Sequence, residues 1–115
     1  MAEPTVYFNP SCSKCRTAQG ILAEKGIDAT FVRYLDTPPT IDELRHLMTL
    51  LGIEDPRAMM RTNEAVYEEL ELGKKSPGEL LAAITTHPIL LERPIVVVGG
   101  RAVIARPPER LFEIL

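Results

Sequence analysis

The fold is decided by the stretch Phe8-Asn9-Pro10-Ser11-Cys12-Ser13-Lys14-Cys15-Arg16. A β-like run, Thr5–Phe8, leads into this stretch, and a helical pattern leaves it, with apolar residues at Ala18, Ile21 and Leu22. The two cysteines are therefore expected on a turn between a strand and a helix. In this arrangement Cys12 falls at or just before the first helical turn.

The expected position of Cys12 has chemical consequences. The first N–H groups of a helix lack intrahelical partners, and the helix dipole adds partial positive charge there. Both effects stabilise a thiolate, so we expect the pKa of Cys12 to lie below that of a free cysteine. Lys14 and Arg16 add formal positive charge within one turn. The same amides can bind an anion, so one loop can supply both a nucleophile and an oxyanion cradle.

The spacing of Cys12 and Cys15 is open to two interpretations. Two close cysteines can be a structural disulfide or buried thiols, because cysteine is among the most buried residue types. A C-x-x-C pair on a strand-to-helix turn of an intracellular chain is instead a redox signature, which favours a functional Cys12. Cys15 is then either a resolving thiol or a residue on the inner face of the first turn.

Composition bounds the class of protein. The chain has 115 residues, of which 45% are hydrophobic and 25% charged, as in one compact soluble domain. The net charge of −3 argues against a direct nucleic-acid partner. No apolar run reaches membrane-spanning length, and the N-terminus lacks the form of a signal peptide. We therefore expect a cytoplasmic protein with no membrane partner, in which thiols stay reduced unless they react.

The first predicted elements form a βαβ unit. The helix that follows Cys12 should end at Gly26, and the β-branched and aromatic run Ala29–Tyr34 then predicts a second strand. This unit is expected to be parallel and right-handed. Capping boxes at Thr40 and Ser76 begin two helices in the middle of the chain. Short helices are predicted between them, after Asp55 and over residues 64–72.

Sheet signals return at the end of the chain. Ile95–Val98 is a continuous apolar run, as expected for a strand buried on both faces. Gly99-Gly100 predicts a hairpin turn, and Ala102–Ala105 predicts the returning strand. A last helix follows Pro107-Pro108, and three of its side chains are expected to face inward: Leu111, Ile114 and Leu115. The order of elements predicts a small α/β domain with a mixed sheet.

Five short segments carry a resemblance to a known family: Asn9–Cys12, Tyr34–Thr40, His87–Leu90, Arg93–Val96 and Arg106–Pro107. They are similar, in register from Thr5 to Leu115, to the glutaredoxin-coupled arsenate reductases. The resemblance implies an α/β, thioredoxin-like fold with a mixed four-stranded sheet. It also implies one domain over residues 1–115, with a helical insertion at about 40–87.

The resemblance assigns roles to individual residues. The family's nucleophilic cysteine falls on Cys12, and its three oxyanion-contacting arginines fall on Arg61, Arg93 and Arg106. Pro94 falls on the family's proline that lies in cis next to the active site. Around Cys12 a supporting loop is expected, in which Arg16 adds charge and two turn formers also orient the thiolate by hydrogen bonding: Asn9 and Ser11.

The implied activity is the reduction of arsenate to arsenite. Arginine suits a tetrahedral oxyanion because the guanidinium stays charged and offers forked donors. The Cys12 thiolate would attack arsenic, glutathione would attack the resulting adduct, and glutaredoxin would resolve the mixed disulfide. The expected partners are arsenate or a similar oxyanion, glutathione as a co-substrate, and glutaredoxin. No metal and no tightly bound cofactor are implied.

Two positions depart from the family's reductases and leave alternatives open. Phe8 stands where well-known members often have histidine, and Cys15 stands where they usually lack a cysteine. A C-x-x-C is characteristic of the related Spx-type redox-sensing regulators, in which a Cys12–Cys15 disulfide would be the switch. Arg106 matches the reductases instead. Phe8 favours a third alternative, a glutathione-dependent thiol reductase with a different substrate.

Overall fold

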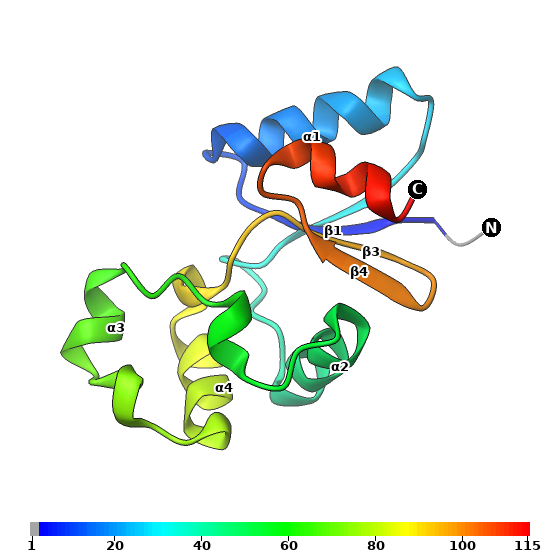
Figure 1. Ribbon diagram of the computed structural model, residues 1–115. Helices are drawn as coiled ribbons and strands as arrows, with labels where there is room; N and C mark the ends of the chain where they lie inside the picture. The colour runs from blue at the N-terminus through cyan, green and yellow to red at the C-terminus, as the bar shows by residue number, and fades with distance from the viewer. Residues whose placement is uncertain (1–2) are drawn as a thin grey trace. The chain divides into compact units, whose positions relative to one another are not determined.

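The chain divides into two units, one of which interrupts the other in sequence (Figure 1). The computed structural model describes residues 3–115. The first unit consists of Met1–Thr37 and Arg93–Leu115, and the second is Pro38–Glu92. The second unit contains the segment predicted as a helical insertion. That the whole chain forms one domain stays a prediction.

A mixed four-stranded sheet organises the first unit, with the strand order β2-β1-β3-β4. β1 (Thr5–Phe8) pairs in parallel with β2 (Thr30–Arg33) and antiparallel with β3 (Ile95–Val98). β3 continues through the Gly99-Gly100 turn into β4 (Arg101–Ile104), which pairs with it antiparallel. The predicted α/β class and the thioredoxin-like arrangement are thus confirmed. β1 is a central strand and ends at the Cys12 turn.

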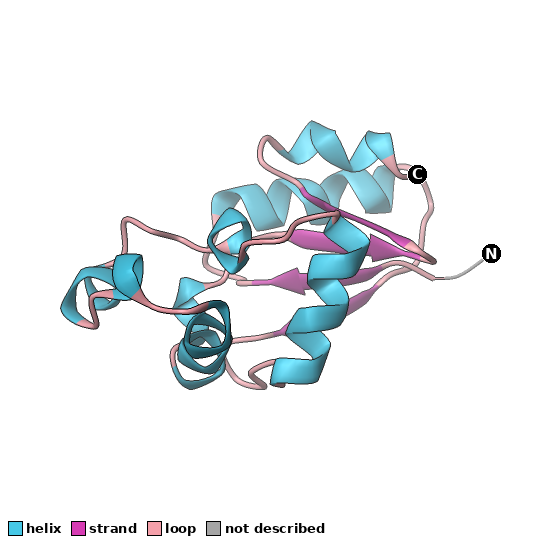
Figure 2. Ribbon diagram, turned by 60° about the horizontal axis from the view of Figure 1, so that its bottom comes forward, coloured by secondary structure: helices cyan, strands magenta, loops and turns pink. Residues whose placement is uncertain are grey.

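Two helices of the first unit lie side by side on one face of its sheet, as both views show (Figure 1, Figure 2). They are α1 (Ser13–Glu24) and the 3-10 helix η4 (Pro108–Glu113). Apolar side chains of both helices and of the strands form one buried cluster, which includes Val6, Cys15, Leu22, Val96, Val103 and Leu111. Cys15 therefore belongs to the core on the inner face of α1.

One inward-facing residue was predicted wrongly at the C-terminus. Leu111 is buried and Ile114 is partly buried, as expected, but Leu115 is 45% exposed. A 3-10 helix has about three residues per turn, so positions 111 and 114 share a face and position 115 does not. The helix itself ends at Glu113, which leaves Leu115 beyond its last turn.

The second unit is helical, and the predicted capping boxes begin its two longest helices. α2 (Ile41–Leu51) starts after Thr40, and α4 (Pro77–Thr86) starts after Ser76. The Thr40 hydroxyl accepts from the backbone N–H of Glu43 at 3.1 Å, and the Glu43 carboxylate accepts in return from Thr40 N–H at 3.1 Å. Each box satisfies backbone donors that a helix start leaves open.

Shorter helices connect these two. They are η1 (Pro56–Met59), α3 (Ala65–Glu69), η2 (Leu72–Lys74) and η3 (Pro88–Leu90). The helix predicted over residues 64–72 is therefore split into α3 and η2. Glu71 lies between these two helices with φ of 53°, a left-handed conformation that a continuous α-helix does not admit.

A short antiparallel pairing closes the second unit near its end. Met60 and Leu91 form an isolated β-bridge. Arg61 N–H donates to the Leu90 carbonyl at 2.7 Å, and Glu92 N–H donates to the Met59 carbonyl at 2.8 Å. The pairing fixes the backbone of Arg61.

Within residues 3–115, no helix has the length and apolar character needed to cross a membrane.

Candidate active site

The turn before α1 holds Cys12 at the helix start. Cys12 is the N-cap residue, and its carbonyl accepts from Arg16 N–H at 3.1 Å. Asn9 builds the turn, because its carbonyl accepts from Cys12 N–H at 2.9 Å and its Oδ1 accepts from Ser11 N–H at 2.9 Å. The Cys12 side chain remains partly exposed. The sequence-based placement of Cys12 at the helix start is confirmed.

The pKa of the Cys12 thiol is lowered to near neutral pH. Burial alone would raise its pKa, but nearby polar groups outweigh burial and lower the pKa from 9.0 to about 7. The groups that lower it are the backbone N–H of Cys15, the guanidinium of Arg93, the thiol of Cys15 and the backbone N–H of Lys14, although neither amide makes a regular capping hydrogen bond to the Cys12 side chain. Both amides belong to the first helical turn, where N–H groups have no intrahelical partner. The lowered pKa favours the thiolate, the nucleophilic form, near neutral pH.

Cys15 behaves in the opposite way. Its side chain is fully buried, and both cysteines are free thiols. Burial raises the pKa of Cys15 to about 11, although the backbone N–H of Asn9, which donates to its Sγ at 3.4 Å, acts against this. The charge of Cys12 raises it further. Cys15 is consequently a protonated thiol at neutral pH, and its presence helps to lower the pKa of Cys12.

Arg93 is the cation that contacts the Cys12 sulfur. Burial alone would lower the pKa of Arg93, but the hydrogen bond to Cys12 outweighs it and the pKa is raised. Two guanidinium nitrogens of Arg93, Nε and NH1, are buried without a hydrogen-bond acceptor among the described residues. A buried donor left unpaired costs about 1–3 kcal/mol. Arg93 thus carries donors that an anion could use. Pro94 follows in cis, as the resemblance implies.

Arg106 lies next to Arg93. Its NH1 donates to the Arg93 carbonyl at 3.0 Å, just before β3 begins and just after β4 ends. The first unit therefore brings together three of the predicted site residues: Cys12, Arg93 and Arg106. The bond between Arg106 and Pro107 is also cis, which the sequence analysis did not predict.

Arg61 belongs to the second unit and is not a solvated surface cation. Its side chain is only 16% exposed, its Nε donates to Glu64 Oε1 at 2.9 Å, and its NH1 lies 3.6 Å from Glu92 Oε1. Sequence reasoning missed both carboxylates. The three-residue spacing of Arg61 and Glu64 was a signal for the first pair, whereas nothing local pointed to Glu92.

The remaining supporting residue, Arg16, contributes through its backbone. Its N–H closes the first turn of α1 on the Cys12 carbonyl, and its side chain is exposed. No group of three or more His, Cys, Asp or Glu side chains in residues 3–115 is arranged to hold a metal ion.

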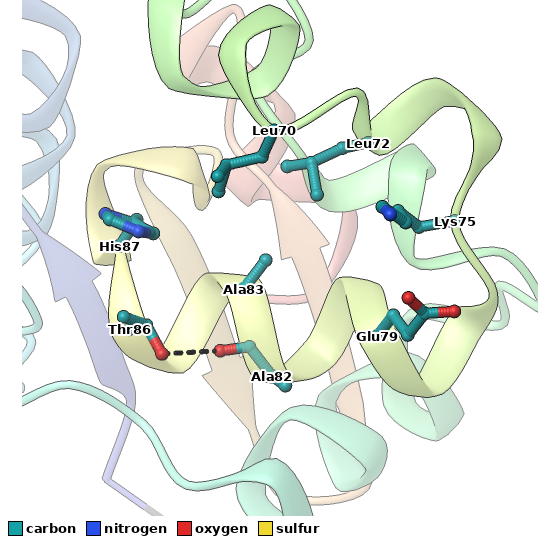
Figure 3. A pocket seen from close by; sticks show the side chains of 8 residues that line it. All are labelled: Leu70, Leu72, Lys75, Glu79, Ala82, Ala83, Thr86 and His87. Carbon is teal, nitrogen blue, oxygen red and sulfur yellow. Dashed lines mark hydrogen bonds between the residues drawn. The ribbon is translucent and has the colours of Figure 1, made fainter.

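A shallow groove of about 370 Å³ lies elsewhere, in the second unit between α4 and residues 70–75 (Figure 3). Leucine and alanine side chains form half of its lining, with His87 at one end and Lys75 and Glu79 at the other. None of the predicted site residues lines this groove. The Cys12 turn, which holds the thiol of lowered pKa, is the candidate active site.

A thioredoxin-like fold with a low-pKa cysteine at the start of its first helix defines a class of thiol-dependent redox proteins. Within this class the chain belongs to the ArsC family, whose profile matches residues 7–114. It is 44% identical to an arsenate reductase of Neisseria meningitidis serogroup A, over 100% of both chains. It is also 44% identical to the uncharacterized protein YfgD of Escherichia coli, over 96% of this chain and 94% of the relative. A solved arsenate reductase from Vibrio cholerae has a TM-score of 0.96 and 45% identity, covering 99% of this chain and 98% of its own.

Proposed function

We propose that this protein is an arsenate reductase in which the Cys12 thiolate attacks the arsenic atom of bound arsenate. Membership of the ArsC family and full-length similarity to relatives named arsenate reductase support the proposal. The observation that carries it is the partly exposed residue Cys12, whose pKa is lowered to about 7 by groups that include the Arg93 guanidinium. The nucleophile, Cys12, thus lies beside a cation, Arg93, that can bind an anion.

In the first step the Cys12 sulfur forms a bond to arsenic. One arsenate hydroxyl takes up a proton and leaves as water, so that arsenic stays pentavalent in the covalent adduct. Arg93 and Arg106 neutralise the remaining oxygens, because guanidinium groups pair with oxyanions through forked donors. The two unpaired nitrogens of Arg93 support this role. Arg61 is proposed as the third oxyanion ligand on the family resemblance.

In the second step another thiol attacks the Cys12 sulfur. The electron pair of the sulfur–arsenic bond passes to arsenic, which leaves as trivalent arsenite, and a disulfide forms on Cys12. We propose glutathione as this second thiol and glutaredoxin as the protein that reduces the mixed disulfide. Cys15 is a poor alternative attacker, because its thiol is fully buried and its raised pKa of about 11 keeps it protonated. The same two properties disfavour a Cys12–Cys15 disulfide switch.

Steady-state turnover of arsenate with glutathione and glutaredoxin tests the proposal. Cys12→Ser is expected to abolish turnover, because a serine hydroxyl does not ionise near neutral pH; unimpaired turnover would end the proposal. Arg106→Ala is expected to raise KM for arsenate. Arg101→Ala is its matched control, since it removes the same charge from an exposed position in β4.

A further inference from the structure

Two carboxylates hold the Arg61 guanidinium from within the second unit. Glu64 accepts from Nε at 2.9 Å, and Glu92 lies 3.6 Å from NH1. The three side chains are 16%, 25% and 24% exposed, so they are largely shielded from water. The Glu64 contact is a charge-assisted hydrogen bond, whereas the Glu92 contact is longer than a hydrogen bond. Glu64 is therefore the carboxylate that can fix the direction of the guanidinium plane.

Arg61 and Glu64 are joined by two hydrogen bonds, one through the backbone and one through the side chains. The backbone N–H of Glu64 donates to the Arg61 carbonyl at 3.2 Å, and the Arg61 side chain donates back to the Glu64 carboxylate. The N–H of Arg61 is itself bonded to the Leu90 carbonyl at 2.7 Å. Both the backbone and the side chain of Arg61 are thus fixed before any ligand arrives. An unrestrained arginine would lose about 2 kcal/mol of rotamer freedom on being ordered by a ligand.

The same contacts leave one nitrogen of the guanidinium, NH2, available. Arginine has five N–H donors in a planar fork. The Glu64 bond uses Nε–H, and within residues 3–115 no hydrogen-bond acceptor is found for NH2. NH1 faces the Glu92 carboxylate, so NH2 is the nitrogen through which an anion can bind without breaking the Glu64 bond.

We propose that Glu64 is a positioning residue, which holds Arg61 by Nε so that NH2 of the guanidinium stays available to the oxyanion. The inference rests on the proposed function, because it takes Arg61 as an oxyanion ligand. The hydrogen bond and the charge of Glu64 act in opposite directions. The bond orients Arg61 and strengthens anion binding, while the negative charge repels an anion.

Variants of Glu64 separate these two effects. Glu64→Gln keeps an oxygen acceptor for Nε–H and removes the charge, whereas Glu64→Ala removes both. Arsenate KM is expected to rise about tenfold in Glu64→Ala, the scale of one lost hydrogen bond to a charged group, with kcat nearly unchanged. In Glu64→Gln the KM is expected to equal or fall below the wild-type value. Glu69→Ala, the same loss of charge at an exposed position of α3, is the matched control and should leave KM unchanged.

A second readout follows Arg61 without arsenate turnover. The Nε–H resonance of Arg61, assigned by its loss in Arg61→Lys, is expected to broaden in Glu64→Ala and to persist in Glu64→Gln. An unchanged resonance in Glu64→Ala, or an unchanged or lowered KM in that variant, overturns the inference. If the wild-type protein reduced no arsenate, the proposed function would fail, and the resonance comparison would still decide whether Glu64 positions Arg61.

Discussion

The Cys12 turn and the Arg61 turn each stabilise one charged group, but the groups and the residues that stabilise them carry opposite charges. At Cys12 an anion is stabilised by backbone amides of α1, a neighbouring thiol and Arg93. At Arg61 a cation is stabilised by two carboxylates. Amides of a helix start cannot be removed by a side-chain substitution, whereas carboxylates can. The two turns should therefore respond differently to mutation.

Arg93 is expected to give the largest effect among the groups around these turns. Wild-type Cys12 should be alkylated by iodoacetamide at a rate that rises with pH through a midpoint of about 7, as the thiolate forms. Arg93→Ala removes a donor that lowers the pKa of Cys12, so the midpoint should move upward. Arsenate kcat/KM should fall roughly 100-fold or more, as for loss of a preorganised oxyanion donor.

Arg61→Ala provides the contrast to Arg93→Ala. It should weaken arsenate turnover while leaving the alkylation midpoint of Cys12 in place, since Arg61 is not among the donors to that sulfur. Equal midpoints in wild type and Arg93→Ala would contradict the assignment of Arg93 as the cation on Cys12.

Substitutions of Cys15 should have an intermediate effect. Cys15→Ala removes the thiol that donates to Cys12, so the pKa of Cys12 should rise and the alkylation midpoint should shift upward. Cys15→Ser keeps a donor at this position and should retain a midpoint near the wild-type value and most arsenate turnover. Loss of turnover in both variants, with glutathione present, would instead identify Cys15 as the resolving thiol.

Arg16 should give the smallest effect. Its side chain is exposed, and its contribution to the turn is a backbone N–H that any residue except proline supplies. Screening by water and salt weakens the charge of an exposed side chain. Alkylation of Cys12 in Arg16→Ala should therefore follow nearly the wild-type pH profile. A clear upward shift would mean that side-chain charge, and not the amides, governs the Cys12 turn.

Local signals explain why much of the fold was predictable from sequence. The capping boxes at Thr40 and Ser76 and the apolar run of β3 each encode structure within a few residues. The same holds for Cys12, whose environment is largely the first turn of its own helix. The break at Glu71 was not predictable, because a glutamate in a left-handed conformation leaves no mark in the helical pattern around it.

Contacts between distant segments explain what the sequence did not reveal about the site. Arg93 was assigned through the family resemblance, and no spacing in the chain indicated that its guanidinium contacts Cys12. The pairing of Arg61 with Glu92 likewise depends on the bridge between Met60 and Leu91, which brings two remote segments together. Such pairings follow from tertiary structure and have no periodic pattern.

One peptide bond joins Glu92, a partner of Arg61, to Arg93, the partner of Cys12. The backbone on both sides of that bond is hydrogen-bonded. Glu92 N–H donates to the Met59 carbonyl, and the Pro94 carbonyl accepts from Ala105 N–H. An extra residue inserted there would break one of these hydrogen bonds. It would also disturb the contact of Glu92 with Arg61 and that of Arg93 with Cys12. The solvent-facing turn at Gly99-Gly100 does not join two such contacts. Length variation among homologous chains should therefore accumulate at that turn and be excluded between positions 92 and 93.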